Sequence, residues 1–346
     1  MSDRPDFERR LDQLRESASA DGRIDAPGTH AIGSPVPLRD GVLAEYYGQP
    51  LLKRPVWTWE IPAYFFVGGA AGASSVIGAV ANAMGGRPDL VRDARWVAAA
   101  GAALSPPLLI SDLGRPDRFL SMLRVFKLQS PMSVGVWTLL AFSNAAGAAA
   151  LADFIDRKSG GRIPVRVIGN AAEVLSAATG LVLSTYTGVL IGATTIPVWS
   201  QNVRLLPLHF GASGVGTAVS VLELMGHHDA ALNALGIGAA AIETAIGFSL
   251  EGRDDPALDP LKHGWSGRVT RVGGVLSGPV PLALRVLGAR SQTARRAAAI
   301  STIVGSILTR AGWLAAGRQA TTQRGDGALQ GAKDRIDEAR RRSAND

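Results

Sequence analysis

The sequence contains no cysteine and only five histidines among its 346 residues. Without a thiol, the chain holds no disulfide, no iron–sulfur cluster of its own and no thiolate metal site. A bis-histidine haem needs facing imidazoles inside a helix bundle, and only His209 lies well within an apolar stretch. We therefore expect no haem, no iron–sulfur cluster and no metal on this chain.

Charged residues are also few, at 19% of the chain, whereas hydrophobic residues reach 47% and the mean hydropathy is +0.15. This composition is too apolar for an ordinary soluble domain and indicates a membrane protein with polar ends. The net charge of +7 is carried mostly by the predicted tails and loops. There it fits solvent and lipid headgroups, so we expect contact with membrane lipid and no nucleic-acid partner.

Eight apolar segments are candidates for membrane-spanning helices, because about 20 helical residues cross a hydrocarbon core of roughly 30 Å. The segments lie at 61–83, 96–113, 132–152, 170–192, 206–226, 230–250, 270–288 and 297–317. The seventh contains Pro279, Pro281 and Arg285, and the eighth contains Arg310 near its middle, so each is also a candidate for an interfacial helix. The sequence predicts an all-α membrane bundle of about eight transmembrane helices.

Glycine is abundant, with 41 residues. Small residues let membrane helices approach closely where lipid supplies no hydrophobic driving force. Gly68 and Gly72 lie one helical turn apart in the first segment and form one such small-xxx-small pair. The composition therefore predicts tight packing through small helix faces.

The two ends of the chain differ from this apolar middle. Residues 1–55 are charged, rich in Pro and Gly, and lack the apolar core of a signal peptide, so we expect a soluble N-terminal arm. A short amphipathic helix is expected at residues 7–16. Residues 319–346 alternate basic and acidic side chains and predict a solvated, charged C-terminal tail.

Seven ionisable side chains fall within or beside the predicted spans, where the cost of burying a charge makes each a functional candidate. They are Glu60, Asp112, Glu173, His209, Glu223, Glu243 and Arg310. Glu60 and Glu173 lie in the first turns of their predicted helices, where the helix dipole alone favours a carboxylate. Glu223 and Glu243 lie deeper, on consecutive spans, and are candidates for a proton route.

Three stretches combine polar and aromatic residues in a way that points to a ligand site. Residues 57–60 read Trp-Thr-Trp-Glu and place a carboxylate among aromatic residues at the start of a glycine-rich helix. Residues 112–119 read Asp-Leu-Gly-Arg-Pro-Asp-Arg-Phe, a pattern that favours a hydrogen-bonded bracing loop. In residues 184–188, Tyr186 requires a hydrogen-bond partner, for which a quinone carbonyl and a backbone carbonyl serve equally well.

With these stretches, the sequence resembles the NrfD/polysulfide reductase membrane-subunit family. The resemblance covers about residues 55–200 and rests on the Trp-x-Trp start, the loop at 112–119, Ser-Pro-Met-Ser at 130–133 and Tyr-x-Gly at 186–188. Beyond residue 200, only the number of helices supports it.

The resemblance implies a pair of four-helix bundles with a quinone or quinol, menaquinone or ubiquinone, in the first bundle. It also implies two partners, a ferredoxin-like iron–sulfur subunit and a molybdopterin oxidoreductase catalytic subunit, and a place in the bacterial inner membrane. We accordingly divide the sequence into a soluble arm (1–55), a first four-helix bundle with the quinone site (56–200), a second four-helix bundle (201–318) and a charged tail (319–346).

The resemblance also assigns site residues. Tyr186 matches the tyrosine of the Tyr-x-Gly motif, which is thought to hydrogen-bond a quinone carbonyl, and Glu60 stands near a polar position of the first helix that lines the same pocket. Some members carry a histidine one turn further along, where this sequence has Ala63 and Tyr64. The predicted catalytic residues are Glu60, Tyr186 and Asp112, and the predicted quinone-binding residues are Tyr186, Glu60, Trp59, Tyr64 and His209.

The sequence therefore predicts a membrane subunit that binds quinone and exchanges electrons with the iron–sulfur cluster of a partner, with coupled uptake or release of protons. Two other functions stay open. The protein could conduct protons or ions without redox chemistry, along a path lined by Glu173, Glu223, Glu243 and Arg310. Alternatively, it could be a passive membrane anchor for a soluble redox enzyme.

Overall fold

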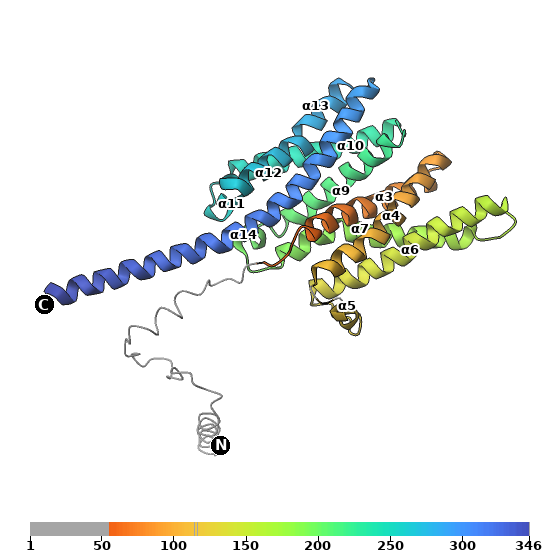
Figure 1. Cartoon of the computed structure of the whole chain (residues 1–346). Helices are drawn as coiled ribbons and strands as arrows, with labels where there is room; N and C mark the ends of the chain where they lie inside the picture. Colours follow the sequence, from red (N-terminus) through yellow and green to blue (C-terminus); the bar gives the residue numbers. More distant parts are fainter. Residues whose placement is uncertain (1–54, 114, 116, 346) are drawn as a thin grey trace, which may run out of the picture. The chain divides into compact units, whose positions relative to one another are not determined.

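The computed structural model describes residues 55–345 except 114 and 116, and it describes no side chains at 117, 118 and 323–345. The predicted arm, with its helix at 7–16, lies outside the described residues apart from Pro55. The described part is helical and contains no strand, which confirms the all-α prediction (Figure 1). Its elements are α3 (Glu60–Ala83), α4 (Pro88–Asp112), α5 (Asp117–Met122), α6 (Pro131–Ser159), α7 (Arg166–Gly192), α8 (Pro197–Ser200), α9 (Leu205–Leu224), α10 (Ala230–Gly252), η1 (Pro256–Leu258), α11 (Asp259–Lys262), α12 (Gly264–Ser277), α13 (Pro279–Leu287) and α14 (Gln292–Asn345).

Among the residues that the structure describes, six stretches of helix are long and apolar enough to cross a membrane, namely α3, α6, α7, α9, α10 and the Gln292–Thr322 part of α14. The predicted number of eight therefore stays unconfirmed. The second segment forms most of α4, whose first turns carry charged side chains. The seventh segment breaks at Gly278 into α12 and α13, where Pro279 supplies no backbone N–H to continue the helix.

The eighth predicted span belongs to a longer helix than expected. The α14 backbone continues without a break to Asn345, so the charged residues after 318 extend the same helix (Figure 1). Arg310, which made this span a candidate for an interfacial helix, is fully buried. Its Nη1 donates to Ser213 Oγ at 2.7 Å, and its guanidinium lies 5.4 Å from the centre of the Phe210 ring. Burial inside the protein removes the cost of exposing this cation to lipid.

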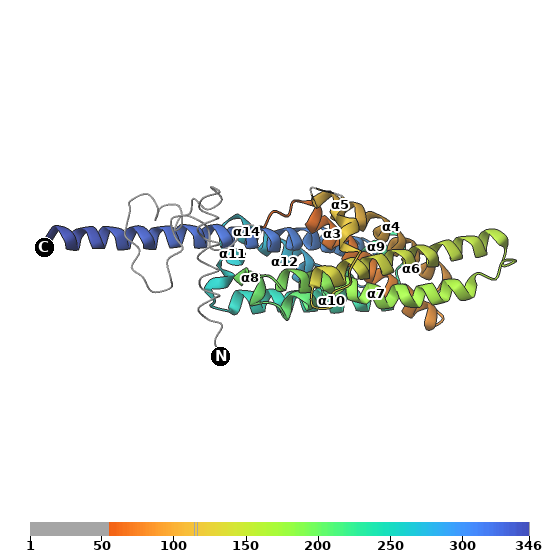
Figure 2. The same cartoon turned by 90° about the horizontal axis from the view of Figure 1, so that it is seen from below.

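The helices pack in two groups. In the first helix group (α3, α4, α6 and α7), α3 packs against α4 and α7, and α6 packs against α7 and α4. In the second helix group (α9, α10, α12, α13 and α14), α14 packs against α9, α12 and α13. Helix α9 also contacts α3 and α7 and so joins the groups (Figures 1 and 2). The domain boundaries at 200 and 318 stay predictions.

The first helix group has two chemically distinct ends. At the Trp57 end, where α3 and α6 begin and α4 and α7 finish, Thr58 bonds to Asp112 and Tyr186 bonds to Pro131. The opposite end carries ion pairs, such as the one between Arg95 and Glu173 at 2.8 Å. The stretches singled out in the sequence thus collect at the Trp57 end.

Helices α3 and α7 are in close contact at Gly72. A Cβ atom built on Gly72 would lie 2.3 Å from the carbonyl oxygen of Gly180, and one on Gly180 would lie 2.2 Å from Ser75 Oγ. Neither position has room for a side chain. Gly68 differs, because a Cβ there would meet the Tyr64 ring at an ordinary contact of 3.5 Å. Of the predicted small-residue pair, Gly72 therefore forms the close helix contact.

Candidate functional site

Two of the predicted catalytic carboxylates are linked at the Trp57 end by a residue that the sequence did not single out. The backbone N–H of Thr58 donates to Asp112 Oδ1 at 2.8 Å, and its hydroxyl lies 2.9 Å from the same oxygen. The Thr58 hydroxyl also lies within hydrogen-bonding reach of Glu60 Oε2. Glu60 and Asp112 are half-buried. One hydroxyl therefore lies between two carboxylates that are 52 positions apart in the sequence. It donates to one of them at a time and can accept from the other when that carboxyl group carries a proton.

Helix geometry places these groups. Glu60 is the first residue of α3 and Asp112 is the last of α4, so the antiparallel packing of α3 on α4 brings them to the same end. The residue before α3, Trp59, makes no side-chain cap. Thr58 carries the hydroxyl, and it stands inside the Trp-x-Trp motif. The sequence could have identified Thr58 by its position between two tryptophans and close to Glu60.

Tyr186 is buried in α7 at the same end. Its hydroxyl donates to the carbonyl oxygen of Pro131 at 2.5 Å. The sequence allowed a quinone carbonyl or a backbone carbonyl as the partner, and the structure shows a backbone carbonyl. Pro131 is the first residue of α6, and its neighbour Ser130 caps that helix by accepting from the Ser133 N–H. The Tyr186 ring lies directly over Gly135, which leaves room for it. The oxygen of Tyr186 retains lone pairs that can accept a further hydrogen bond.

The aromatic residues at this end divide into inward-facing and outward-facing ones. Trp59 is 70% exposed, whereas Trp57 stacks on Trp199 with 5.6 Å between ring centroids. Tyr64 is buried, with its ring 5.8 Å from that of Phe65. Among the described residues, no hydrogen-bond partner is found for the Tyr64 hydroxyl. Tyr64 therefore faces the interior of the first helix group, and Trp59 faces away from it.

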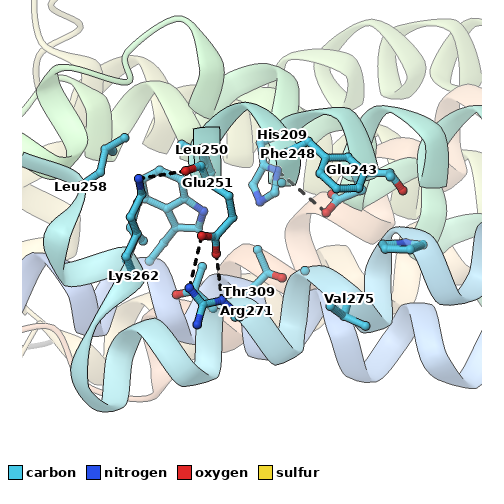
Figure 3. A pocket seen from close by; sticks show the side chains of 17 residues that line it. His209, Glu243, Phe248, Leu250, Glu251, Leu258, Lys262, Arg271, Val275 and Thr309 are labelled. Atoms are coloured by element: carbon cyan, nitrogen blue, oxygen red, sulfur yellow. Dashed lines mark hydrogen bonds and ion pairs between the residues drawn. The ribbon is translucent and has the colours of Figure 1, made fainter. Parts of the chain in front are cut away.

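His209 lies elsewhere. It is buried on α9, and its Nδ1 is 3.8 Å from Glu243 Oε2 on α10 (Figure 3). Its ring packs near Phe210 and Trp313. With Glu243 it lines a pocket of about 150 Å³ in the second helix group, which Tyr186 and Glu60 do not line. The four other predicted quinone-binding residues therefore do not line the pocket that His209 lines.

Two of the carboxylates considered for a proton route are held by arginines. Glu173 binds Arg95 through both oxygens, at 2.9 and 2.8 Å, and also accepts from Asn82 at 2.6 Å. Helix α7 begins at Arg166, so Glu173 lies in its third turn and not in the first turn as predicted. Glu223 pairs with Arg285 at 2.8 Å and with Arg295 at 2.7 Å. Charge-assisted pairs of this kind are strong hydrogen bonds and brace the helices that carry them.

The acidic and imidazole side chains are spread through the molecule. Within the residues that the structure describes, no group of three or more His, Asp and Glu side chains converges in a way that could hold a metal ion.

Comparison with known proteins gives one family match and one curated relative. A sequence model of the family described as "Polysulphide reductase, NrfD" matches residues 50–228, which covers α3 to α9 and extends the resemblance beyond residue 200. The C subunit of the polysulfide reductase of Wolinella succinogenes is 28% identical over 188 residues. That alignment covers 49% of the sequence and 58% of the relative, so the match spans less than two thirds of the relative's length.

Proposed function

This protein belongs to the NrfD polysulphide reductase family and is a multi-pass membrane protein, and from this premise we propose that it is the quinone-binding subunit of a membrane oxidoreductase complex. The observation that carries the proposal is the gathering of Tyr186, the bridge between Glu60 and Asp112, and Tyr64 at one end of the first helix group. We place the quinone head group there.

The residues at the Trp57 end supply two functions that a quinone site needs. Buried Tyr64 and Tyr186 carry hydroxyls that can hydrogen-bond a ring oxygen, and Tyr186 would turn from Pro131 to do so. The bridge of Glu60, Thr58 and Asp112 is half-buried and reaches the surface, so it can pass protons between the site and water. Reduction of a quinone takes up two electrons and two protons, and oxidation of a quinol releases them.

Electrons must come from or go to another polypeptide, because the sequence has no cysteine to hold an iron–sulfur cluster. We propose a ferredoxin-like iron–sulfur subunit docked at the Trp57 end, and behind it a molybdopterin oxidoreductase catalytic subunit. The relative named above comes from a bacterium. We place the complex accordingly in the bacterial inner membrane, with menaquinone or ubiquinone as the quinone.

The first test removes the Tyr186 hydroxyl. In the complex, Tyr186→Phe is expected to lower quinone-linked electron transfer about tenfold, because one hydrogen bond to a buried group contributes about 1–1.5 kcal/mol. The protein should still insert and assemble. Thr185→Val is the matched control, since within the described part of the protein the Thr185 hydroxyl bonds only to carbonyls of its own helix. Unchanged activity in Tyr186→Phe would contradict the assignment and favour a passive anchor.

A second test displaces the tyrosine without changing it. A Cβ atom on Gly135 would lie 2.0 Å from Cζ of Tyr186, so Gly135→Ala forces the ring to move and breaks the bond to Pro131. We expect quinone-linked activity to fall at least as far as in Tyr186→Phe. Gly147→Ala on the same helix is the control, because a Cβ there meets no atom within 4 Å. Equal activities of the two alanine variants would argue against a role for Tyr186.

The partner assignment has its own measurement. Gentle extraction from the native membrane through a tag on this protein should recover a cysteine-rich partner together with iron, and molybdenum if the catalytic subunit is a molybdopterin enzyme. A protein recovered alone and free of metal would favour ion conduction without redox chemistry. The arginine partners of Glu173 and Glu223 weigh against that alternative, since they occupy the carboxylates it requires.

A further inference from the structure

The second helix group contains a pocket that the proposed function does not use. It has a volume of about 150 Å³ and lies between α10 and α12, with α9 and α14 behind it (Figure 3). Its walls are mainly apolar. Phe248 on α10 is 72% exposed and Val275 on α12 is 45% exposed, so the pocket reaches the outer surface between these two helices. On a membrane-spanning helix such as α10, that surface faces lipid.

Polar atoms without partners converge on this pocket. Both ring nitrogens of His209, Oε1 of Glu243, Oγ1 of Thr309 and Nε1 of Trp313 are buried and make no hydrogen bond to any described residue. Glu243 Oε2 is in contrast satisfied by Ser277 at 2.8 Å. An unmade hydrogen bond on a buried group costs about 1–3 kcal/mol. Four residues with such atoms around one cavity can therefore offer hydrogen bonds to a molecule that enters it.

At the other end of the pocket, the charged side chains already have partners. Arg271 pairs with Glu251 at 2.8 Å, and Lys262 donates to the backbone carbonyls of Glu251 and Arg253. These charges are already satisfied. The free hydrogen-bonding capacity lies with His209, Glu243, Thr309 and Trp313, and it includes donors as well as acceptors.

We propose that this pocket binds a lipid-soluble aromatic molecule whose ring carries hydroxyl groups, of the hydroquinone class, with its hydroxyls at His209, Glu243, Thr309 and Trp313. A hydroxyl both donates and accepts, which matches this mixture of groups. The oxidised ring only accepts, so it supplies no donor to the acceptors among these atoms. The site therefore favours the reduced form. This inference does not rest on a quinone at Tyr186, because none of the residues at the Trp57 end named above lines the pocket.

The test measures equilibrium binding of a hydroquinone with a ten-carbon alkyl tail, and of its oxidised form, to the complex purified through this protein. Wild type should bind the hydroquinone at a site that Glu243→Leu weakens about tenfold or more and that Tyr186→Phe leaves unchanged. The oxidised form should bind this site about tenfold more weakly than the hydroquinone. Loss of binding only in Tyr186→Phe would overturn the second site. Loss of binding only in Glu243→Leu would support the second site and would contradict the proposed quinone site at Tyr186.

Thr309→Val keeps the test decisive if Glu243→Leu fails to fold. Valine has nearly the same shape, and the Thr309 hydroxyl has no partner among the described residues. A purely structural residue of this kind should tolerate the change or gain stability, because an unsatisfied polar atom is removed. If the pocket holds the hydroquinone, Thr309→Val should instead lower its affinity several-fold. A stable Thr309→Val variant whose affinity for the hydroquinone is unchanged would overturn the proposal.

Discussion

Replacing Glu223 by glutamine is expected to destabilise the folded protein by about 3–5 kcal/mol, the largest effect of any single change considered. The carboxylate is fully buried, and Arg285 and Arg295 beside it are almost as buried. Arg285 Nη1 donates to Glu223 Oε1 at 3.0 Å, and Arg295 Nη2 donates to the same oxygen at 2.7 Å. Glutamine keeps the shape but removes the negative charge that pairs with both arginines. Two guanidinium groups are then left buried without a counter-charge.

Unfolding of the purified protein in detergent, followed by loss of helical signal against denaturant or temperature, measures this effect. Asp156→Asn is the matched control, since Asp156 pairs at 2.9 Å with Arg166, whose side chain is 75% exposed. Such surface pairs contribute about 0–1 kcal/mol. A Glu223→Gln variant as stable as Asp156→Asn would show that the two arginines find other partners. His228 O and Asp229 O, which already accept from Arg295, are the nearest candidates.

Alanine at Gly72 is expected to force α3 and α7 apart and to lower the yield of folded protein sharply. The new Cβ atom would lie 2.3 Å from the Gly180 carbonyl oxygen, and a backbone atom cannot turn aside as a side chain does. Overpacking of this kind typically costs about 1–3 kcal/mol and sometimes more. Because α3 and α7 carry Glu60, Tyr64 and Tyr186, the shift should also disturb the proposed quinone site.

Gly68→Ala provides the comparison, on the same helix and one turn earlier. Its Cβ would meet Tyr64 and Ser105 at 3.5 and 3.6 Å, which are ordinary contacts. Thermal stability in detergent should therefore fall clearly for Gly72→Ala and little for Gly68→Ala. If the two variants were equally stable, the close approach at Gly72 would not be what sets the spacing of α3 and α7.

Hydropathy predicted the helices well because an apolar segment in lipid must satisfy its backbone hydrogen bonds within itself. Seven of the eight predicted segments each lie mainly in one helix, and the seventh forms two. Their limits were less accurate. Helix α4 begins at Pro88 and not at 96, and α6 continues to Ser159 and not to 152, since polar turns beyond the apolar core remain helical. Proline at 279 marked the region in which the seventh segment breaks.

Partners of the buried charges could not be predicted in the same way. Arg95 lies 78 positions from Glu173, and Arg285 lies 62 positions from Glu223. No local pattern links residues so far apart. Both carboxylates were rightly singled out as buried, but only packing reveals that arginines hold them.

By itself, the sequence determined the class of protein, the positions of its helices and the motifs that gather at the Trp57 end, because hydropathy and motif spacing are local properties. The tertiary structure decided which side chains meet. In the structure, Thr58 contacts both Glu60 and Asp112. Trp57 stacks on Trp199, whereas Trp59 is exposed. His209, which was predicted to bind quinone, lies beside Glu243. These outcomes depend on how each helix is rotated and packed against helices distant in the sequence, which no single segment specifies.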